Sequence, residues 1–236
     1  MNELLVSWPP LTRGTLLRRY KRFMADVMLD DGAAVTAHCP NSGRMLSCSE
    51  PGRPVHLSTS DRPGRKFPYT WEMIEMPGSP VVVNTMRANQ IARSAIERGL
   101  LPELSGYTSI RQEVRTSDRS RIDLLLTGEH RPPCLVEVKS STLVEDGTAM
   151  FPDAVTERGL KHVWELELMC RKGYRGVMLF IIQRMDARSL TPSAHIDPAY
   201  ANGLRKAWRK GLEVMAYDTV IDLAGIALGR NVPCIV

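Results

Sequence analysis

Hydrophobic and polar positions alternate in short runs over the first third of the chain. Turn-forming stretches such as DDG, PNSG, EPG and MPGSP separate these runs. Several short strands joined by frequent turns are typical of a small barrel or sandwich. The pattern therefore predicts an all-β N-terminal part that fits a five-stranded OB-like barrel, with strands near residues 23–29, 33–38, 54–58, 70–75 and 81–83.

From about residue 84 the apolar spacing lengthens to that of helices. Residues 88–99 place Ile91, Ala95 and Ile96 on one helical face. This change of period divides the chain into 1–83 and 84–236. The second part has the order α-β-β-β-α-β, so that the whole chain is α/β with an all-β start. Its elements are expected at residues 88–99, 109–115, 122–127, 135–138, 157–172 and 177–183, followed by a helix over 198–210.

The strands 122–127 and 135–138 carry the chemistry that the sequence suggests. A hairpin centred near His130 places Asp123 opposite Glu137, and cross-strand Cβ atoms lie roughly 5 Å apart. Lys139 shares a face with Glu137 because side chains two apart in a strand point the same way. Two carboxylates held this close favour a bound cation, and Mg²⁺ (or Mn²⁺) prefers such oxygen ligands.

An Asp followed by Glu-x-Lys on the next strand is the pattern of PD-(D/E)xK nucleases, although Ile122 stands where the usual proline precedes the Asp. The alternative is a solvated hairpin, because Glu-x-Lys is common on amphipathic strands. In such nucleases an acid from the first helix joins the metal site, and Glu97 is the candidate, unless it is simply solvated. Gln183, at the end of an apolar strand, is predicted to reach the rim of the sheet.

Charge adds a preference for polyanions. The 236 residues carry a formal net charge of +5. A basic segment near the N-terminus either contacts phosphates or forms an edge strand whose charges face water. A second basic loop and Lys161, which can also pair with Glu157, extend the DNA-binding candidates. The turn Asn41–Gly43 either binds an anion through its amides or is an ordinary connector. The DNA-binding candidates are Arg13, Arg18, Arg19, Lys21, Arg22, Arg65, Lys66 and Lys161.

Other classes of protein are disfavoured. The five cysteines include no Cys-x-x-Cys spacing, which argues against a disulfide framework and fits a reducing cytoplasm. The N-terminus lacks the features of a secretory signal, and the longest apolar run, Val177–Ile182, is too short to cross a membrane. His162 has no evident partner in the sequence.

Several segments together resemble the sugar fermentation stimulation protein A (SfsA) family: RRYKRFMADV, TAHCPNSGRM, KFPYTWE, RIDLLL, VEVKSSTLVEDG, FPDAVTERGLKH and LFIIQR. The resemblance implies a bacterial cytoplasmic protein with an OB-fold and a PD-(D/E)xK nuclease-like domain. It also implies DNA binding without sequence preference and a regulatory link to maltose metabolism. It assigns metal roles to Asp123 and Glu137 and the lysine role to Lys139.

Two hypotheses follow. In the first, Asp123, Glu137 and the Val138 carbonyl bind Mg²⁺ in a phosphodiesterase site, and Glu97 acts through water or from behind these ligands. Lys139 orients the attacking water, and Gln183 positions Lys139 or a phosphate. In the second, the same fold is a non-catalytic DNA-binding regulator. A sugar sensor is a weaker third idea, because the sequence indicates no sugar pocket.

Overall fold

The N-terminal strands close into a barrel in the computed structural model, which describes residues 3–60, 64, 66–117 and 120–236. The strands pair in the order β4-β3-β2-β5-β6-β7, and a further β4–β6 pairing closes the ring. Trp71 and the aliphatic side chains of these strands fill its interior. The predicted OB-like barrel is confirmed. Its strands are β2 (Leu11–Tyr20), β3 (Met24–Leu29), β4 (Ala34–His38), β5 (Pro54–Thr59), β6 (Tyr69–Met76) and β7 (Ser79–Val82).

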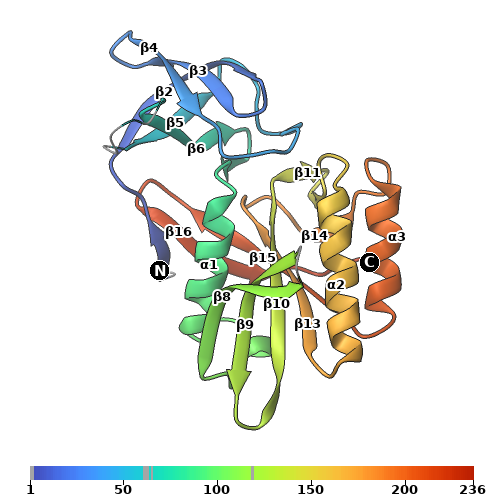
Figure 1. Cartoon of the computed structure of the whole chain (residues 1–236). Coiled ribbons are helices and arrows are strands. Elements are labelled where there is room, and N and C mark those ends of the chain that lie inside the picture. Colours follow the sequence, from blue (N-terminus) through green and yellow to red (C-terminus); the bar gives the residue numbers. More distant parts are fainter. Residues whose placement is uncertain (1–2, 61–63, 65, 118–119) are drawn as a thin grey trace.

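A seven-stranded sheet forms the second part of the molecule (Figure 1). The strand order is β1-β16-β15-β13-β10-β9-β8, with β10, β13 and β15 parallel to one another. Apolar side chains on both faces of β13 explain its central position. The strands are β1 (Leu4–Ser7), β8 (Ser109–Ser117), β9 (Ser120–Gly128), β10 (Arg131–Ser141), β13 (Arg175–Ile182), β15 (Glu213–Ile221) and β16 (Gly225–Asn231).

Helices cover both faces of this sheet. Helix α1 (Met86–Glu97) buries Ile91 and its neighbours against one face. Helices α2 (Glu157–Arg171) and α3 (Pro198–Trp208) pack on the other. The predicted α-β-β-β-α-β order is therefore confirmed. A short 3-10 helix (Pro102–Leu104) and a small sheet of β11 (Leu143–Glu145), β12 (Thr148–Phe151) and β14 (Ser189–Pro192) complete the part of the chain that the structure describes.

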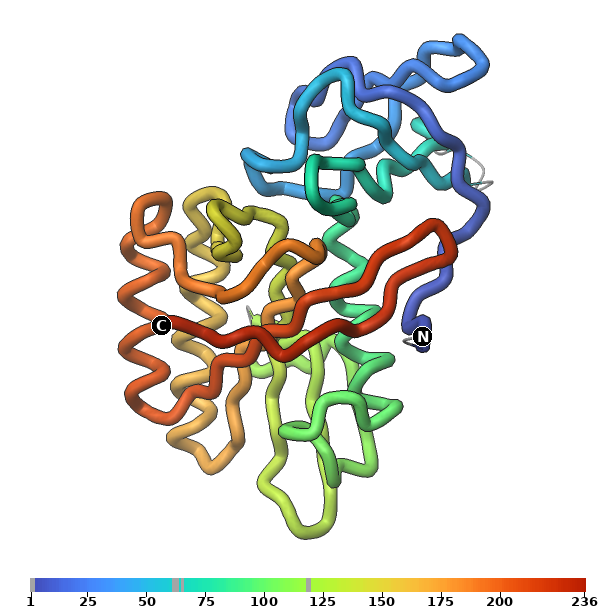
Figure 2. Tube along the Cα trace, turned by 180° about the vertical axis from the view of Figure 1, so that it is seen from behind, coloured from blue at the N-terminus to red at the C-terminus, as the bar shows by residue number. Residues whose placement is uncertain are grey.

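The first strand lies apart from the barrel that follows it. Strand β1 pairs antiparallel with β16, so Leu4–Ser7 belongs to the large sheet although the predicted boundary groups it with residues 1–83. Figure 2 shows the N-terminal segment beside the β15–β16 hairpin at the back of the molecule. Leu5 and Val6 are buried there, and the burial of these apolar side chains stabilises the pairing of β1 with the large sheet.

Polar side chains join the barrel to the sheet. The Gln183 amide donates to the carbonyl oxygens of Val82 (3.1 Å) and Asn84 (3.3 Å) and to Ser140 Oγ (2.9 Å). The Arg184 guanidinium donates to Ser47 Oγ at 3.0 Å. Because these groups are buried and hydrogen-bonded across the boundary, they hold the domains in one arrangement.

The turn Asn41–Gly43 is a connector in this junction. The Gly43 N–H donates to Asn41 Oδ1, and the Met45 N–H donates to Asp153 Oδ2, both at 2.8 Å. Asp153 packs so closely on Gly43 that a Cβ there would collide with its carboxylate. These amides are therefore used within the protein, which disfavours the anion-binding interpretation of the turn.

Candidate metal and phosphodiester site

The β9–β10 hairpin brings the two predicted acids together. Its register pairs Leu125 with Leu135 and Leu124 with Val136. One residue further along, the same register places Asp123 opposite Glu137. The two strands separate at this point. The Val138 N–H therefore donates to the Asp123 carboxylate, at 2.8 Å, and not to a main-chain carbonyl of the neighbouring strand. The acids thus lie where the sheet opens towards the surface.

Asp123 accepts two hydrogen bonds, but its surroundings disfavour its ionised form. Its second oxygen accepts a hydrogen bond from Asn89 Nδ2 on α1 at 3.0 Å. Burial, and then the negative charge of Glu137, raise the pKa of Asp123 to about 6 despite these two hydrogen bonds. A carboxyl group in this state gains from any cation that binds beside it.

Glu137 is almost fully buried, with only 2% of the residue exposed. Oε1 accepts a hydrogen bond from Lys139 Nζ at 2.5 Å and also contacts His162 Nδ1 on α2. Burial alone would raise the pKa of Glu137, but the His162 hydrogen bond and the charge of Lys139 outweigh it and lower the pKa. Its other oxygen, Oε2, is buried and has no hydrogen-bond partner among the residues that the structure describes.

This donor set fits a hard divalent cation. A buried carboxylate oxygen without a partner is costly and calls for a ligand. Asp123, Glu137 and the Val138 carbonyl offer oxygen only, which suits Mg²⁺, Mn²⁺ or Ca²⁺ better than Zn²⁺. Among the described residues no three His, Cys, Asp or Glu side chains form a metal cluster. A cation at this site would therefore depend on the main chain and water for its remaining ligands.

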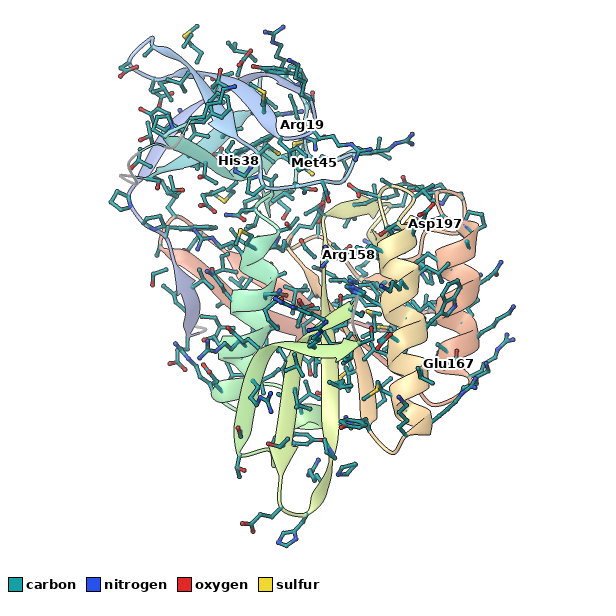
Figure 3. The ribbon with its side chains drawn as sticks, in the orientation of Figure 1. Arg19, His38, Met45, Arg158, Glu167 and Asp197 are labelled. Atoms are coloured by element: carbon teal, nitrogen blue, oxygen red, sulfur yellow. The ribbon has the colours of Figure 1, made fainter. Side chains whose placement is uncertain are left out.

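A cavity of about 440 Å³ lies over the acids and is lined from both domains. Asp123, Glu137 and Lys139 line it from the sheet, and Asn89 lines it from α1. Arg158 and His162 line it from α2, and Arg22 lines it from the barrel. Figure 3 shows Arg158 on the side of α2 that faces β9 and β10, while Glu167 lies at the far end of the same helix.

Glu97 and Gln183 lie away from this cavity. Glu97 is exposed and pairs with Arg93 at 2.7 Å; it lines a neighbouring hollow with Asp123. Asn89 is the residue of α1 that forms a hydrogen bond with Asp123. It lies about two turns, or roughly 12 Å along the helix, from Glu97. Gln183 is fully buried at the domain junction, where its amide holds main-chain oxygens.

The predicted DNA-binding residues divide into two groups. Arg13 pairs with Asp30, Arg18 pairs with Asp26, and the Arg19 guanidinium holds the carbonyl oxygens of Asn41, Gly43 and Arg44. These three are committed within the barrel because its strands juxtapose them with acceptors. Lys21 and Arg22 form the β2–β3 turn, Lys66 lies over the Phe67 ring, and Lys161 lies on α2 near the site. Arg65 is outside the described residues.

Sequence reasoning missed three residues of the site. Asn89 and Arg158 are residue types that are ordinary on the surface of a helix, so the sequence does not mark them as functional. The sequence shows no partner for His162, and the fold supplies one in Glu137. The only signal in the sequence was their position on the helices that flank the hairpin, since helical phase brings Asn89, Arg158 and His162 towards the cavity.

None of the helices in the described part of the chain combines the length and apolar character needed to cross a bilayer. The architecture is an OB barrel followed by a PD-(D/E)xK nuclease-like domain, with the acids of the motif at the mouth of the central hairpin. Family comparison agrees with both halves. Residues 17–83 match the SfsA N-terminal OB domain, and residues 86–225 match the sugar fermentation stimulation protein RE domain.

The chain belongs to the SfsA family. It is 52% identical to the sugar fermentation stimulation protein homolog of Pelobacter propionicus over 96% of this chain and 98% of that one. The homolog from Geobacter sulfurreducens is 51% identical over 95% and 96%. A solved structure of Pyrococcus furiosus SfsA in complex with Ca²⁺ superposes with a TM-score of 0.90 at 29% identity, covering 99% and 100% of the two chains. The predicted family membership is confirmed.

Proposed function

We propose that this protein is a divalent-metal-dependent phosphodiesterase that cleaves DNA without sequence preference. The observation that carries the proposal is the buried, partnerless Oε2 of Glu137 opposite Asp123, at the base of a cavity lined by arginines. The Ca²⁺ complex of the Pyrococcus furiosus relative supports the binding of a divalent cation by this fold. The proposed natural ion is Mg²⁺ or Mn²⁺.

The residues have distinct roles in this proposal. Asp123, Glu137 and the Val138 carbonyl hold the cation, which when bound supplies Lewis-acid stabilisation of charge on the phosphoryl oxygens. Lys139, already beside Glu137, donates to the attacking water or to a phosphate oxygen and so orients the nucleophile for in-line attack. Asn89 keeps the Asp123 carboxylate turned towards the cavity.

His162 is proposed to fix the orientation of Glu137 and not to touch the substrate. By occupying Oε1, it leaves Oε2 for the cation, and partners of this kind typically contribute 10- to 100-fold to metal affinity. His162→Ala is therefore expected to raise the dissociation constant for Ca²⁺ by about this factor in calorimetry. His162→Asn, whose amide can replace the Nδ1 donor, is expected to recover most of the affinity. Equal losses in both variants would show that the hydrogen bond is not what matters.

The affinity for the cation is expected to depend on pH. Because Asp123 has a pKa of about 6, the cation must displace a proton from it below that pH. We expect the dissociation constant for Ca²⁺ to be constant above pH 7 and to increase up to about tenfold per unit below pH 6. Titrations at several pH values measure this slope, and Asp123→Asn removes its source together with the site.

A second candidate function is a DNA-binding regulator without catalysis. The observation that favours it is that the Glu137 carboxylate already has a cationic partner in Lys139 and a hydrogen-bond partner in His162. The names of the relatives suggest a link to sugar fermentation, and we propose that either function provides this link through DNA. The free cysteines in the described structure fit action in the reducing cytoplasm.

A cleavage assay separates the two functions. Labelled single- and double-stranded DNA is incubated with the protein and Mg²⁺, Mn²⁺ or EDTA. The proposal expects cleavage with either metal, none in EDTA, and none with Glu137→Gln. Glu129→Gln, an acid lost from the exposed turn of the same hairpin, serves as the matched control and should cleave normally. Tight DNA binding without cleavage in any metal would favour the regulator.

A further inference from the structure

A second hollow adjoins the site and is not used by the chemistry described above. It has a volume of about 820 Å³ and lies between the β8–β9 strands and the start of α2. Arg158 and His162 line both this hollow and the cavity over the acids, so the two spaces meet at these residues. Among its described lining residues, four are basic and two acidic; the basic ones are Arg115, Arg121, Arg158 and Lys161.

Arg158 occupies a position that does not favour an arginine. It is the second residue of α2, after the N-cap Thr156 and Glu157, where the helix dipole disfavours positive charge. Arg158 and Arg121 are both exposed, and neither forms an ion pair with an acid of the described chain. Arg158 lies where the hollow meets the cavity, and Arg121 lies on the wall of the hollow. Both arginines are suited to bind phosphates.

Arg22 adds a third cation at the opposite side of the cavity. Lys21 and Arg22 form the β2–β3 turn with φ of 47° and 61°, a left-handed backbone that glycine or asparagine adopts at lower cost. Strain of this kind persists where the surrounding structure or a function requires it. The turn brings Arg22 to the lining of the cavity over Asp123 and Glu137.

The barrel also limits what can enter. The Met45 N–H to Asp153 hydrogen bond (2.8 Å) and the Ser47 Oγ to Thr142 carbonyl hydrogen bond (3.1 Å) tie barrel loops to the loops of the second domain. Arg19 stiffens the same barrel loop by holding three of its carbonyl groups. The acids therefore lie in a partly open cavity of about 440 Å³, the scale of a small-ligand site, with the barrel loops on one side of it.

We infer that the substrate is a single strand of DNA, whose backbone runs from Arg22 past the acids to Arg158 and on along Arg121. The inference rests on the proposed function and adds its substrate class. A single strand can place one nucleotide in a bounded cavity and its neighbours along the basic hollow, whereas an intact double helix is too wide to follow. Basic grooves that track one backbone are the usual means of single-strand binding.

Binding is measured separately from cleavage. Fluorescence anisotropy with Ca²⁺ present compares a labelled single strand with a blunt duplex of the same sequence, and a gel verifies that the DNA stays intact. We expect the single strand to bind at least tenfold more tightly. Arg121→Gln and Arg158→Gln should each weaken single-strand binding about three- to tenfold and reduce the slope of log affinity against log salt by about 0.7.

Two variants control for charge and folding. Arg209→Gln, on the exposed end of α3, removes the same charge far from the path and should change neither affinity nor slope. Arg22→Gly should weaken single-strand binding while leaving the melting temperature unchanged or higher, because glycine accepts the left-handed turn. Variants at Arg121 and Arg158 that bind no worse than Arg209→Gln would overturn the path.

The outcomes distinguish this inference from the proposed function. Equal or tighter binding of the blunt duplex overturns the single-strand inference even if the protein cleaves DNA with Mg²⁺. Preferential, arginine-dependent binding of the single strand without cleavage in any metal supports the path and contradicts the phosphodiesterase. Single-strand preference in both binding and cleavage supports both.

Discussion

Replacing Asp123 by asparagine is expected to abolish metal-dependent cleavage and, at the same time, to stabilise the metal-free protein. The metal loses one of its two carboxylate ligands, so we expect at least a hundredfold lower rate. The fold loses a charge that it disfavours, since burial and Glu137 raise the pKa of Asp123 to about 6. Asparagine still accepts from the Val138 N–H, and the Asn89 amide can rotate to match it.

The stability gain has a definite dependence on pH. A carboxyl group whose pKa is raised in the folded state costs stability once it ionises, which is complete above about pH 6 and absent below about pH 4. Above pH 7 the gain should be on the order of 1–3 kcal/mol, and it should vanish towards pH 4. Melting curves in EDTA over this range test it, with Glu129→Gln as control. A lower melting temperature at pH 7 would show that the Asp123 hydrogen bonds outweigh its charge.

The destabilisation caused by ionised Asp123 also predicts how the cation changes the melting temperature. Added Ca²⁺ should raise the melting temperature of the unmodified protein and leave that of Asp123→Asn nearly unchanged, because a ligand stabilises only the state that binds it. Without metal, the unmodified protein should therefore be less stable than Asp123→Asn. With Ca²⁺ bound, it should be more stable than this variant. This reversal connects the two carboxylates to the ion more directly than loss of activity does.

The hairpin was predictable because its information is local. The period of two puts Glu137 and Lys139 on one face, and the turn near His130 sets the register that brings Asp123 opposite them. The barrel strands and the helices of the second domain follow from periodicity and turn residues in the same way. The strand β1 was missed because its partner, β16, lies more than two hundred residues away.

The helical contribution to the site was not predictable from residue type. An acid was expected from the first helix, yet the structure places Asn89 beside Asp123 and leaves Glu97 on the surface with Arg93. Sequence patterns give the face of a helix but not how far along its axis the neighbouring strand ends. The angle of packing decides that, and it depends on side chains from several elements.

The roles of the long polar side chains were also not predictable from residue type. Arg19 and Gln183 were expected to face DNA or the reaction, but Arg19 holds main-chain oxygens of a barrel loop and Gln183 holds main-chain oxygens at the domain junction. A buried polar side chain is used wherever acceptors meet it, and only the folded chain brings these acceptors to it. Arg158 is the converse case, since an unremarkable helix residue lies where two cavities meet.

Replacing Lys139 by methionine is expected to separate metal binding from catalysis. The ammonium lies 2.5 Å from Glu137 Oε1 and 3.4 Å from His162 Nδ1, so it repels a divalent cation at the same carboxylate. Its removal should therefore tighten Ca²⁺ binding about tenfold, equal to roughly 1.4 kcal/mol. Cleavage should nevertheless decrease by about a hundred- to a thousandfold, because the group that orients water or phosphate is gone.

Lys139→Arg provides the matched control for charge. It retains the cation, so its affinity for Ca²⁺ should stay near that of the unmodified protein, while its different shape impairs cleavage. Calorimetry with Ca²⁺ and single-turnover cleavage with Mg²⁺ measure the two effects on the same variants. If methionine and arginine tighten Ca²⁺ binding equally, charge competition at Glu137 is wrong. If methionine weakens Ca²⁺ binding, Lys139 helps to hold the Glu137 carboxylate in its metal-binding orientation, and this effect outweighs the charge repulsion.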